Sequence, residues 1–242
     1  MVILMYRVIA SDVDGVIKPY YDPVPPELAG ILRRLSRKYF VVLLSGRQVT
    51  YLDGLITGMG INPENMALIG EEGSVIMLPK DYTVTFSLQK SDMDEFLRFR
   101  EKLMATLYNV FGHDIFMPPT FIILTISAGK RFSAVDKFVK EFIAKENTEK
   151  LVKLVYHRMH NVIQVMPFKT NKYIALKALY EELGFDMSET IAIGDGRNDI
   201  PVLKEAGFPV AVGDDEEVAK YGRVRFRTGL EAFRYIEEQL GF

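Results

Sequence analysis

Short apolar runs alternate with amphipathic segments over the first third of the chain. The runs at 7–13, 39–46 and 66–70 are rich in β-favouring residues and show no alternation, which is typical of strands buried on both faces. The segments at 25–38 and 48–60 carry apolar residues at helical spacing. Strands that alternate with helices through short links predict right-handed crossovers and a parallel sheet.

The pattern changes between residues 81 and 167, where about two strands accompany each helix. Ser91 is expected to cap the first of these helices. The strands are expected at 83–88, at 121–127 and in a hairpin around "RMHN", and the helices after Ser91 and at 133–145. Such a pattern predicts a small α+β domain with an antiparallel sheet. We therefore expect an inserted domain at 81–167 and a core domain made of 1–80 and 168–242.

Strand and helix alternate again in the last third of the chain. The predicted helix at 171–184 ends at Gly184, a residue common just after a helix. The remaining elements are expected as strands at 190–195, 209–213 and 224–226 and as a final helix at 229–240. The fold class predicted from the whole pattern is α/β, with a Rossmann-like parallel-sheet core interrupted by an α+β insertion.

The amino-acid composition limits the classes of protein to which this chain can belong. The chain has 242 residues, of which 48% are hydrophobic and 26% are charged, as in ordinary globular proteins. A net charge of −2 does not favour a nucleic-acid partner, and the absence of cysteine excludes disulfide and thiolate chemistry. No apolar run has the length of a membrane span, and the N-terminus lacks a signal-peptide pattern. We expect a cytoplasmic protein, monomeric or homodimeric, without a membrane partner.

Two aspartates, Asp12 and Asp14, follow the first predicted strand. Ligands of open α/β sheets bind at the carboxyl ends of strands, and residues two apart in an extended segment point to the same side. Adjacent carboxylates repel each other unless a cation lies between them. A helix cap or a turn would explain the pair equally well. A calcium loop fits poorly, because the spacing lacks a third ligand and a late glutamate.

Two further stretches suggest that an anion binds nearby. Ser45, Gly46 and Arg47 follow the second strand, where a hydroxyl, a small residue and a helix start can cradle an anion, although a simple turn is an alternative. Lys172 begins a predicted helix, where a cation is unfavourable unless an anion is bound. A solvated lysine is the alternative there.

The last stretch, "GDGRND", contains Asp195, Asn198 and Asp199 after a buried strand. Residues four apart lie side by side on one helical turn, so the two carboxylates can converge. Oxygen ligands without histidine or cysteine indicate a hard cation, Mg²⁺ before Zn²⁺. All four stretches fall at the carboxyl ends of predicted strands or at helix starts, which makes coincidence a poor explanation.

In order, "DVDGV", "LLSGR", "NKYIAL" and "GDGRND" resemble the four motifs of the haloacid dehalogenase-like phosphohydrolases. The spacing and the large insertion between the second and third motifs resemble the Cof-type branch, which carries an α+β cap domain. The resemblance covers essentially the whole chain. The length, the "GEEGS" hairpin and "AGFPVAVGDDEEVAKYG" are most similar to the archaeal phosphoglycolate phosphatases.

This resemblance implies a Mg²⁺-dependent phosphatase of carbohydrate metabolism. Its substrate would be a small phosphorylated metabolite, with phosphoglycolate hydrolysed to glycolate and phosphate through an aspartyl-phosphate. Asp12 would be the nucleophile, and Asp14 would protonate the leaving alcohol and then activate water. Mg²⁺ would be held by Asp12, the backbone carbonyl of Asp14, Asp195 and Asp199. The residues implied to bind the phosphate are Ser45, Gly46, Arg47, Lys172 and Asn198.

Some positions leave the identity of the substrate undecided. Glu72 stands where members of the family often have asparagine, and it adds negative charge near the expected site. The predicted cap hairpin contains four polar residues that would either face the substrate or form an exposed turn: His157, Arg158, His160 and Asn161. A sugar-phosphate phosphatase of the same mechanism is one alternative. A non-catalytic binding domain is another, although the intact aspartates and Lys172 argue against it.

Overall fold

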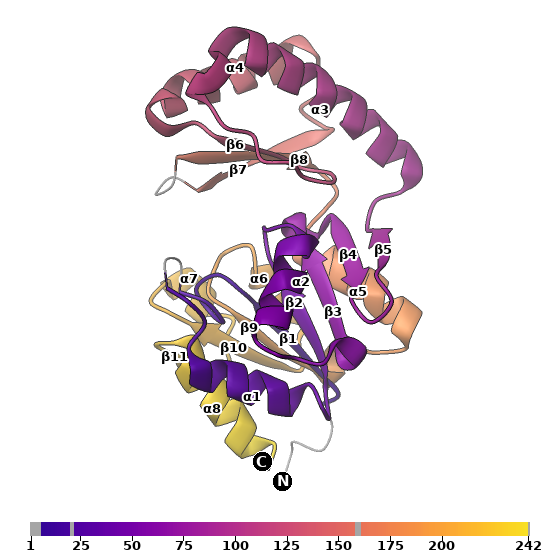
Figure 1. Cartoon of the computed structure of the whole chain (residues 1–242), viewed down its shortest axis with the longest axis vertical. Coiled ribbons are helices and arrows are strands. Elements are labelled where there is room, and N and C mark those ends of the chain that lie inside the picture. Colours follow the sequence, from indigo (N-terminus) through magenta and orange to yellow (C-terminus); the bar gives the residue numbers. More distant parts are fainter. Residues whose placement is uncertain (1–5, 20–21, 158–160, 242) are drawn as a thin grey trace. The chain divides into compact units, whose positions relative to one another are not determined.

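The chain divides into two units in a computed structural model, which describes residues 6–19, 22–157 and 161–241 (Figure 1). Unit 1 consists of residues 1–87 and 171–242, and unit 2 of residues 88–170. Within the described ranges, no helix is both long and apolar enough to cross a membrane.

Unit 1 is built on an eight-stranded sheet with the order β11-β10-β9-β1-β2-β3-β4-β5. Its strands are β1 (Val8–Asp12), β2 (Phe40–Leu44), β3 (Met66–Gly70), β4 (Val75–Leu78), β5 (Thr83–Phe86), β9 (Thr190–Gly194), β10 (Phe208–Val212) and β11 (Val224–Phe226). The six strands from β11 to β3 pair in parallel, and β4 and β5 add an antiparallel edge. The central strands β1, β3 and β9 are buried along their whole length. The predicted parallel α/β core is confirmed.

Helices cover both faces of this sheet. They are α1 (Pro26–Leu35), α2 (Val49–Gly58), α5 (Lys172–Leu183), α6 (Ile200–Glu205), α7 (Glu216–Ala219) and α8 (Gly229–Gln239). Residues of α5, α6 and α7 pack with alternate residues of β1, β2 and β3 in one apolar core. Helices α1 and α2 lie on the opposite face, where α8 lies beside α1 (Figure 1). The sheet is therefore buried on both sides.

Strand β5 differs from the sequence-based expectation. Residues 83–88 were expected in the insertion that begins at 81, but Thr83–Phe86 pairs antiparallel with β4 and forms the edge of the unit 1 sheet. The apolar runs of β4 and β5 are joined by a tight connection, so pairing between neighbours in sequence holds β5 in this sheet. The chain leaves unit 1 after Ser87 and returns at Asn171.

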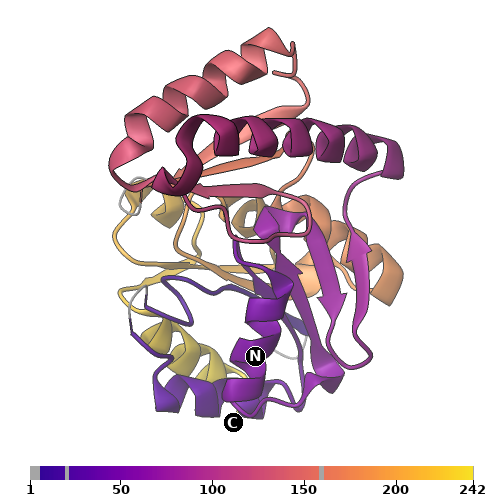
Figure 2. The ribbon, with the colours of Figure 1, turned by 45° about the horizontal axis from the view of Figure 1, so that its top comes forward.

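Unit 2 has a three-stranded antiparallel sheet with the order β6-β8-β7. It contains α3 (Lys90–Phe111), β6 (Leu124–Ser127), α4 (Phe132–Lys145), β7 (Val152–His157) and β8 (Val162–Pro167). The two long helices lie over the sheet (Figure 1, Figure 2) and contact each other through Phe99 and Phe142. Helix α3 begins at Lys90 with Gln89 at its N-cap, so the predicted cap at Ser91 is wrong.

Substitutions at two glycines test how tightly unit 1 is packed. Gly229 begins α8, and a Cβ added there would lie 1.8 Å from the carbonyl oxygen of Val16, whereas Gly54 in α2 has open space around it. We expect Gly229→Ala to lower the free energy of unfolding by about 1–3 kcal/mol because the backbone must move. Gly54→Ala should raise it by about 0.5–1 kcal/mol because alanine favours the helix. Urea unfolding followed by circular dichroism measures both, and equal effects would contradict this account of Gly229.

Candidate active site

Three carboxylates from two neighbouring strand ends form a cluster in unit 1. Asp12 ends β1, and Asp195 and Asp199 lie in the loop after β9, which pairs directly with β1. One oxygen of each aspartate lies within 4.8 Å of the others. Among the residues that the structure describes, this is the one such group of three acidic or metal-ligating side chains. Asp12 and Asp199 are only 6% and 2% exposed, so their charges are removed from water.

Lys172 supplies the countercharge for this cluster. It is the first residue of α5, is 1% exposed, and its Nζ atom donates hydrogen bonds to Asp12 Oδ1 and, at 2.7 Å, to Asp199 Oδ1. A buried ammonium is strongly unfavourable without such partners. Its position at a helix N-terminus is thus explained by the carboxylates that it contacts. The alternative of a solvated lysine is wrong.

The charges in this cluster do not balance, and the pKa values shift accordingly. Burial raises the pKa of Asp12 well above its ordinary value, against the lowering effect of Lys172. Burial and the charge of Asp199 raise the pKa of Asp195 to about 7. Burial lowers the pKa of Lys172, but the charges of Asp12 and Asp199 outweigh it and leave the pKa well above its ordinary value. One ammonium therefore does not neutralise three carboxylates, and a cation or a proton is needed.

The local backbone brings these carboxylates together. Gly15 has a φ of +93°, and a Cβ there would lie 1.9 Å from Asp195 Oδ2, so a glycine is required beside the cluster. Asp199 Oδ2 accepts hydrogen bonds from the backbone N–H groups of Asp195 and Gly196 at 3.1 and 3.0 Å. Carboxylates fixed in this way, with excess negative charge and no nitrogen or sulfur ligand, fit a hard divalent cation such as Mg²⁺.

Asp14 lies outside the three-carboxylate cluster and has a different partner. Arg47 donates two hydrogen bonds of 2.7 Å, one from Nε and one from Nη2, to the two oxygens of Asp14. The Arg47 guanidinium also lies 4.6 Å from the centre of the Tyr51 ring. In this structure Arg47 orients the Asp14 carboxylate, and its expected binding of phosphate stays a prediction. A bidentate pair of this kind fixes the plane of the carboxylate as well as its place.

Ser45 and Gly46 form a tight turn after β2. Ser45 is 1% exposed, and its hydroxyl accepts a hydrogen bond from the backbone N–H of Arg47 at 3.1 Å. Gly46 lies against another side chain, because an added Cβ would be 2.5 Å from Glu72 Oε1. The second predicted stretch therefore sits beside a residue that the four motifs do not include.

That residue, Glu72, contacts the fourth stretch as well. Its two carboxylate oxygens accept hydrogen bonds from Asn198 Nδ2 at 3.3 and 3.0 Å. Asn198 is hydrogen-bonded to Glu72 here, and its expected binding of phosphate stays a prediction. The sequence drew attention to Glu72 only as a departure from the family pattern. Its contacts with Gly46 and Asn198 depend on tertiary structure and leave no signal in local spacing.

The predicted cap residues lie in unit 2 or outside the described residues. Tyr156 donates a hydrogen bond to Asp136 of α4, so the side of β7 that carries Tyr156 faces the helix. His157 is the next residue and points to the opposite face of the strand, where its Nε2 lies 3.0 Å from Gln164 Oε1. Asn161 has a φ of +53° at the start of the next strand. Arg158 and His160 are outside the described residues.

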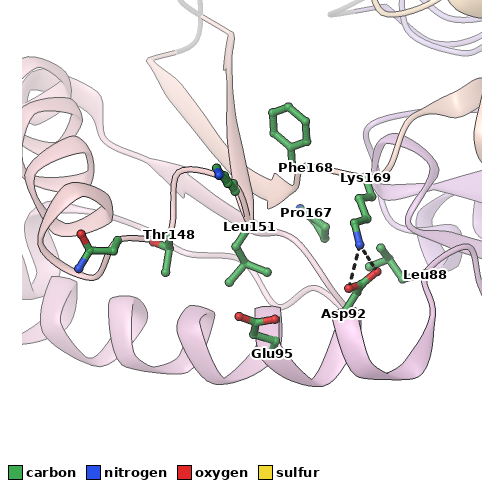
Figure 3. A pocket seen from close by; sticks show the side chains of 10 residues that line it. Leu88, Asp92, Glu95, Thr148, Leu151, Pro167, Phe168 and Lys169 are labelled. Atoms are coloured by element: carbon green, nitrogen blue, oxygen red, sulfur yellow. Dashed lines mark hydrogen bonds and ion pairs between the residues drawn. The ribbon is translucent and has the colours of Figure 1, made fainter.

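Unit 2 also contains a pocket of about 320 Å³, and none of its lining residues is a predicted site residue (Figure 3). It lies between α3 and the segments on either side of the β7–β8 hairpin. Leu151 and Phe168 supply apolar surface, and Lys169 pairs with Asp92 at 2.8 Å across one end. None of the aspartates of the cluster lines it.

The chain is similar to known phosphatases and hydrolases. The family model of the haloacid dehalogenase-like hydrolases matches residues 113–221. The phosphoglycolate phosphatase of Sulfolobus acidocaldarius is 26% identical over 242 residues, which cover 97% of this chain and 96% of that protein. A 5-amino-6-(5-phospho-D-ribitylamino)uracil phosphatase of Bacillus subtilis is 43% identical, but the match covers only 24% of this chain and 23% of that protein.

Two solved structures have the same overall fold as this chain. A haloacid dehalogenase-like hydrolase from Bacteroides thetaiotaomicron superposes with a TM-score of 0.73 at 19% identity, covering 96% of this chain and 99% of that one. A trehalose-6-phosphate phosphatase related protein gives a TM-score of 0.70 at 14% identity, covering 96% and 97%. At these identities the likeness concerns the architecture alone.

The raised pKa of Asp195 makes a prediction for the metal-free protein. Its value of about 7 lies above the ordinary 3.8, so the folded state holds the proton more tightly and its stability falls as pH rises from about 4 to about 7. Asp195→Asn removes the charge, so at pH 8 in chelator it should melt higher than the wild type by roughly 10 °C. At about pH 4, where the wild-type carboxyl is also neutral, the difference should nearly vanish. Scanning calorimetry measures both, and a pH-independent difference would contradict the assignment.

Proposed function

We propose that this chain, a haloacid dehalogenase-like hydrolase as its four motifs predict, is a Mg²⁺-dependent phosphatase of small phosphomonoesters. The observation that carries this proposal is the buried contact of Lys172 with Asp12, beside the carboxylates of Asp195 and Asp199. It combines a candidate nucleophile, a fixed cation and a place for a metal at the ends of two neighbouring strands and the start of α5.

Asp12 is the proposed nucleophile. One of its oxygens forms a bond to phosphorus while the bond from phosphorus to the ester oxygen breaks, which gives an aspartyl-phosphate and an alcohol. Water then attacks this phosphorus and releases inorganic phosphate and the free Asp12 carboxylate. Lys172 holds Asp12 in place through its hydrogen bond and offsets negative charge at the reacting centre.

Mg²⁺ is proposed to bind Asp12, Asp195 and Asp199, with the backbone carbonyl of Asp14 as a further ligand. When bound, it would offset the excess negative charge and allow an anionic carboxylate to approach an anionic phosphate. The donor set fits this role, since all of the ligands are oxygens and the side chains are clustered without another metal-ligating residue type. Phosphate monoesters hydrolyse so slowly in water that up to about 10²¹-fold acceleration is needed, most of it from such charge stabilisation.

Asp14 is the proposed proton carrier. It gives a proton to the departing ester oxygen in the first step and takes one from water in the second. The two hydrogen bonds from Arg47 hold its carboxylate in one orientation, separate from the three-carboxylate cluster. Asp12 and Asp14 thus have distinct surroundings, which suits two different tasks.

Phosphoglycolate is the proposed substrate. The support is the name of the Sulfolobus acidocaldarius relative, which aligns over nearly the whole of both chains. We propose that unit 2 is the α+β cap domain that the sequence predicts and that it influences which alcohol part of the substrate is accepted.

Asp12→Asn is expected to abolish phosphatase activity. With Mg²⁺ present, the wild type should release phosphate from p-nitrophenyl phosphate, and the variant should lose about 10⁴-fold or more in kcat because its amide is not a nucleophile. Chelator should abolish the wild-type activity. Asp214→Asn is a matched control, because the Asp214 side chain is 93% exposed and lies outside the site. Substantial activity in the Asp12 variant, or activity unaffected by chelator, would contradict the mechanism.

A panel of phosphomonoesters tests the substrate separately from the reaction. We expect the highest kcat/KM for phosphoglycolate, compared with hexose phosphates and a ribityl phosphate. A preference for hexose phosphates would overturn the proposed substrate and leave the reaction in place. If no ester is turned over with Mg²⁺ present, the proposal that the chain is an enzyme is wrong, and a non-catalytic binding domain is favoured.

A further inference from the structure

The turn after β3 has an unusual backbone. Glu71 and Glu72 have φ values of 52° and 55°, in the left-handed region that glycine and asparagine adopt most readily. Both are buried, at 0% and 5% exposure. A glutamate is unfavourable in this conformation and unfavourable when buried, so its presence at position 72 calls for a specific set of contacts.

Those contacts join three of the four predicted stretches within unit 1. The Glu72 backbone N–H donates to the carbonyl oxygen of Ser45 at 3.1 Å. The next residue, Gly73, approaches the start of α5 so closely that an added Cβ would lie 2.2 Å from the carbonyl oxygen of Asn171. The Glu72 side chain reaches Asn198 in the loop after β9. The turn at 71–73 is therefore a junction between these segments.

Asn198 is hydrogen-bonded to Glu72 and lies close against Gly196. Its Nδ2 donates to both oxygens of Glu72, while its Oδ1 lies close to Gly196, where an added Cβ would be 2.4 Å away. Asn198 directly precedes Asp199, whose backbone N–H bonds to the Gly196 carbonyl at 3.0 Å. Fixing the Asn198 amide therefore restrains the short loop that carries Asp195 and Asp199.

We propose that Glu72 is a positioning residue for the metal-binding loop, acting through its hydrogen bonds to Asn198. Glu72 is not one of the three clustered carboxylates in the described part of the chain, so it supports the site without contacting the ion. Outer partners that orient metal ligands change metal affinity by about 10–100-fold when removed. The inference rests on the proposed function only in requiring that the aspartate cluster bind a divalent cation.

Mn²⁺ binding to the substrate-free protein, followed by electron paramagnetic resonance, tests this role without any enzyme assay. Glu72→Gly removes the side chain and keeps a residue that favours positive φ, so it separates the carboxylate from backbone strain. We expect it to weaken Mn²⁺ binding about tenfold. Glu72→Gln keeps an oxygen that can accept from Asn198 Nδ2 and should stay within about threefold of the wild type, since a neutral hydrogen bond is weaker but present.

Asn198→Ala should weaken Mn²⁺ binding as much as Glu72→Gly, and the double variant should bind no worse than either single variant. Circular dichroism melting checks that each variant is folded. Unchanged binding by Glu72→Gly would overturn the inference. So would a loss in Glu72→Gln equal to that in Glu72→Gly, because the charge rather than the hydrogen bond would then matter.

Asp195→Asn distinguishes this inference from the proposed function. If it abolishes Mn²⁺ binding while Glu72→Gly leaves binding unchanged, the metal site stands and the role of Glu72 is wrong. If the wild type binds no Mn²⁺, the metal site fails and the role of Glu72 fails with it.

Discussion

A buried ammonium group lies between carboxylates that belong to distant parts of the chain. Lys172 bonds to Asp12, 160 residues earlier, and to Asp199, 27 residues later. Because an unpaired buried charge is so costly, these three groups can be buried only together. The first and last thirds of the chain must therefore fold into one sheet, with β1 beside β9 and the start of α5 against their carboxyl ends.

Close backbone approach makes this arrangement possible. Gly15 leaves room for the Asp195 carboxylate, and Gly73 leaves room for the start of α5 at Asn171. Any side chain at either glycine would separate the segments that carry the charges, and both glycines have positive φ. The same packing brings Glu72 to Asn198, so the loop after β9 is held by the cluster on one side and by the turn at 71–73 on the other. Charge pairing and backbone packing thus support each other.

Much of the fold and of the site could be predicted from the sequence. The uniform apolar runs that became β1, β2 and β3 indicated buried parallel strands, and the acidic and basic residues at their ends indicated a site. Strand β5 was harder, because a short run such as Thr83–Phe86 suits either sheet and its pairing with β4 decides the question. The hydrogen bond from Arg47 to Asp14 could not be predicted either, because an arginine after a strand can bind a ligand anion or a carboxylate of the protein equally well.

The sequence by itself determined the order of most elements, the insertion of an α+β unit and the residues at the carboxyl ends of the core strands, whereas strand β4 (Val75–Leu78) was not predicted. Periodicity and residue type are local properties, and they were sufficient for these conclusions. Only the tertiary structure decided which charges meet. Lys172 pairs with Asp12 and Asp199, Asp195 joins their cluster, Arg47 pairs with Asp14, and Asn198 pairs with Glu72. Such pairings depend on strand order and backbone approach over distances along the chain that no local pattern encodes.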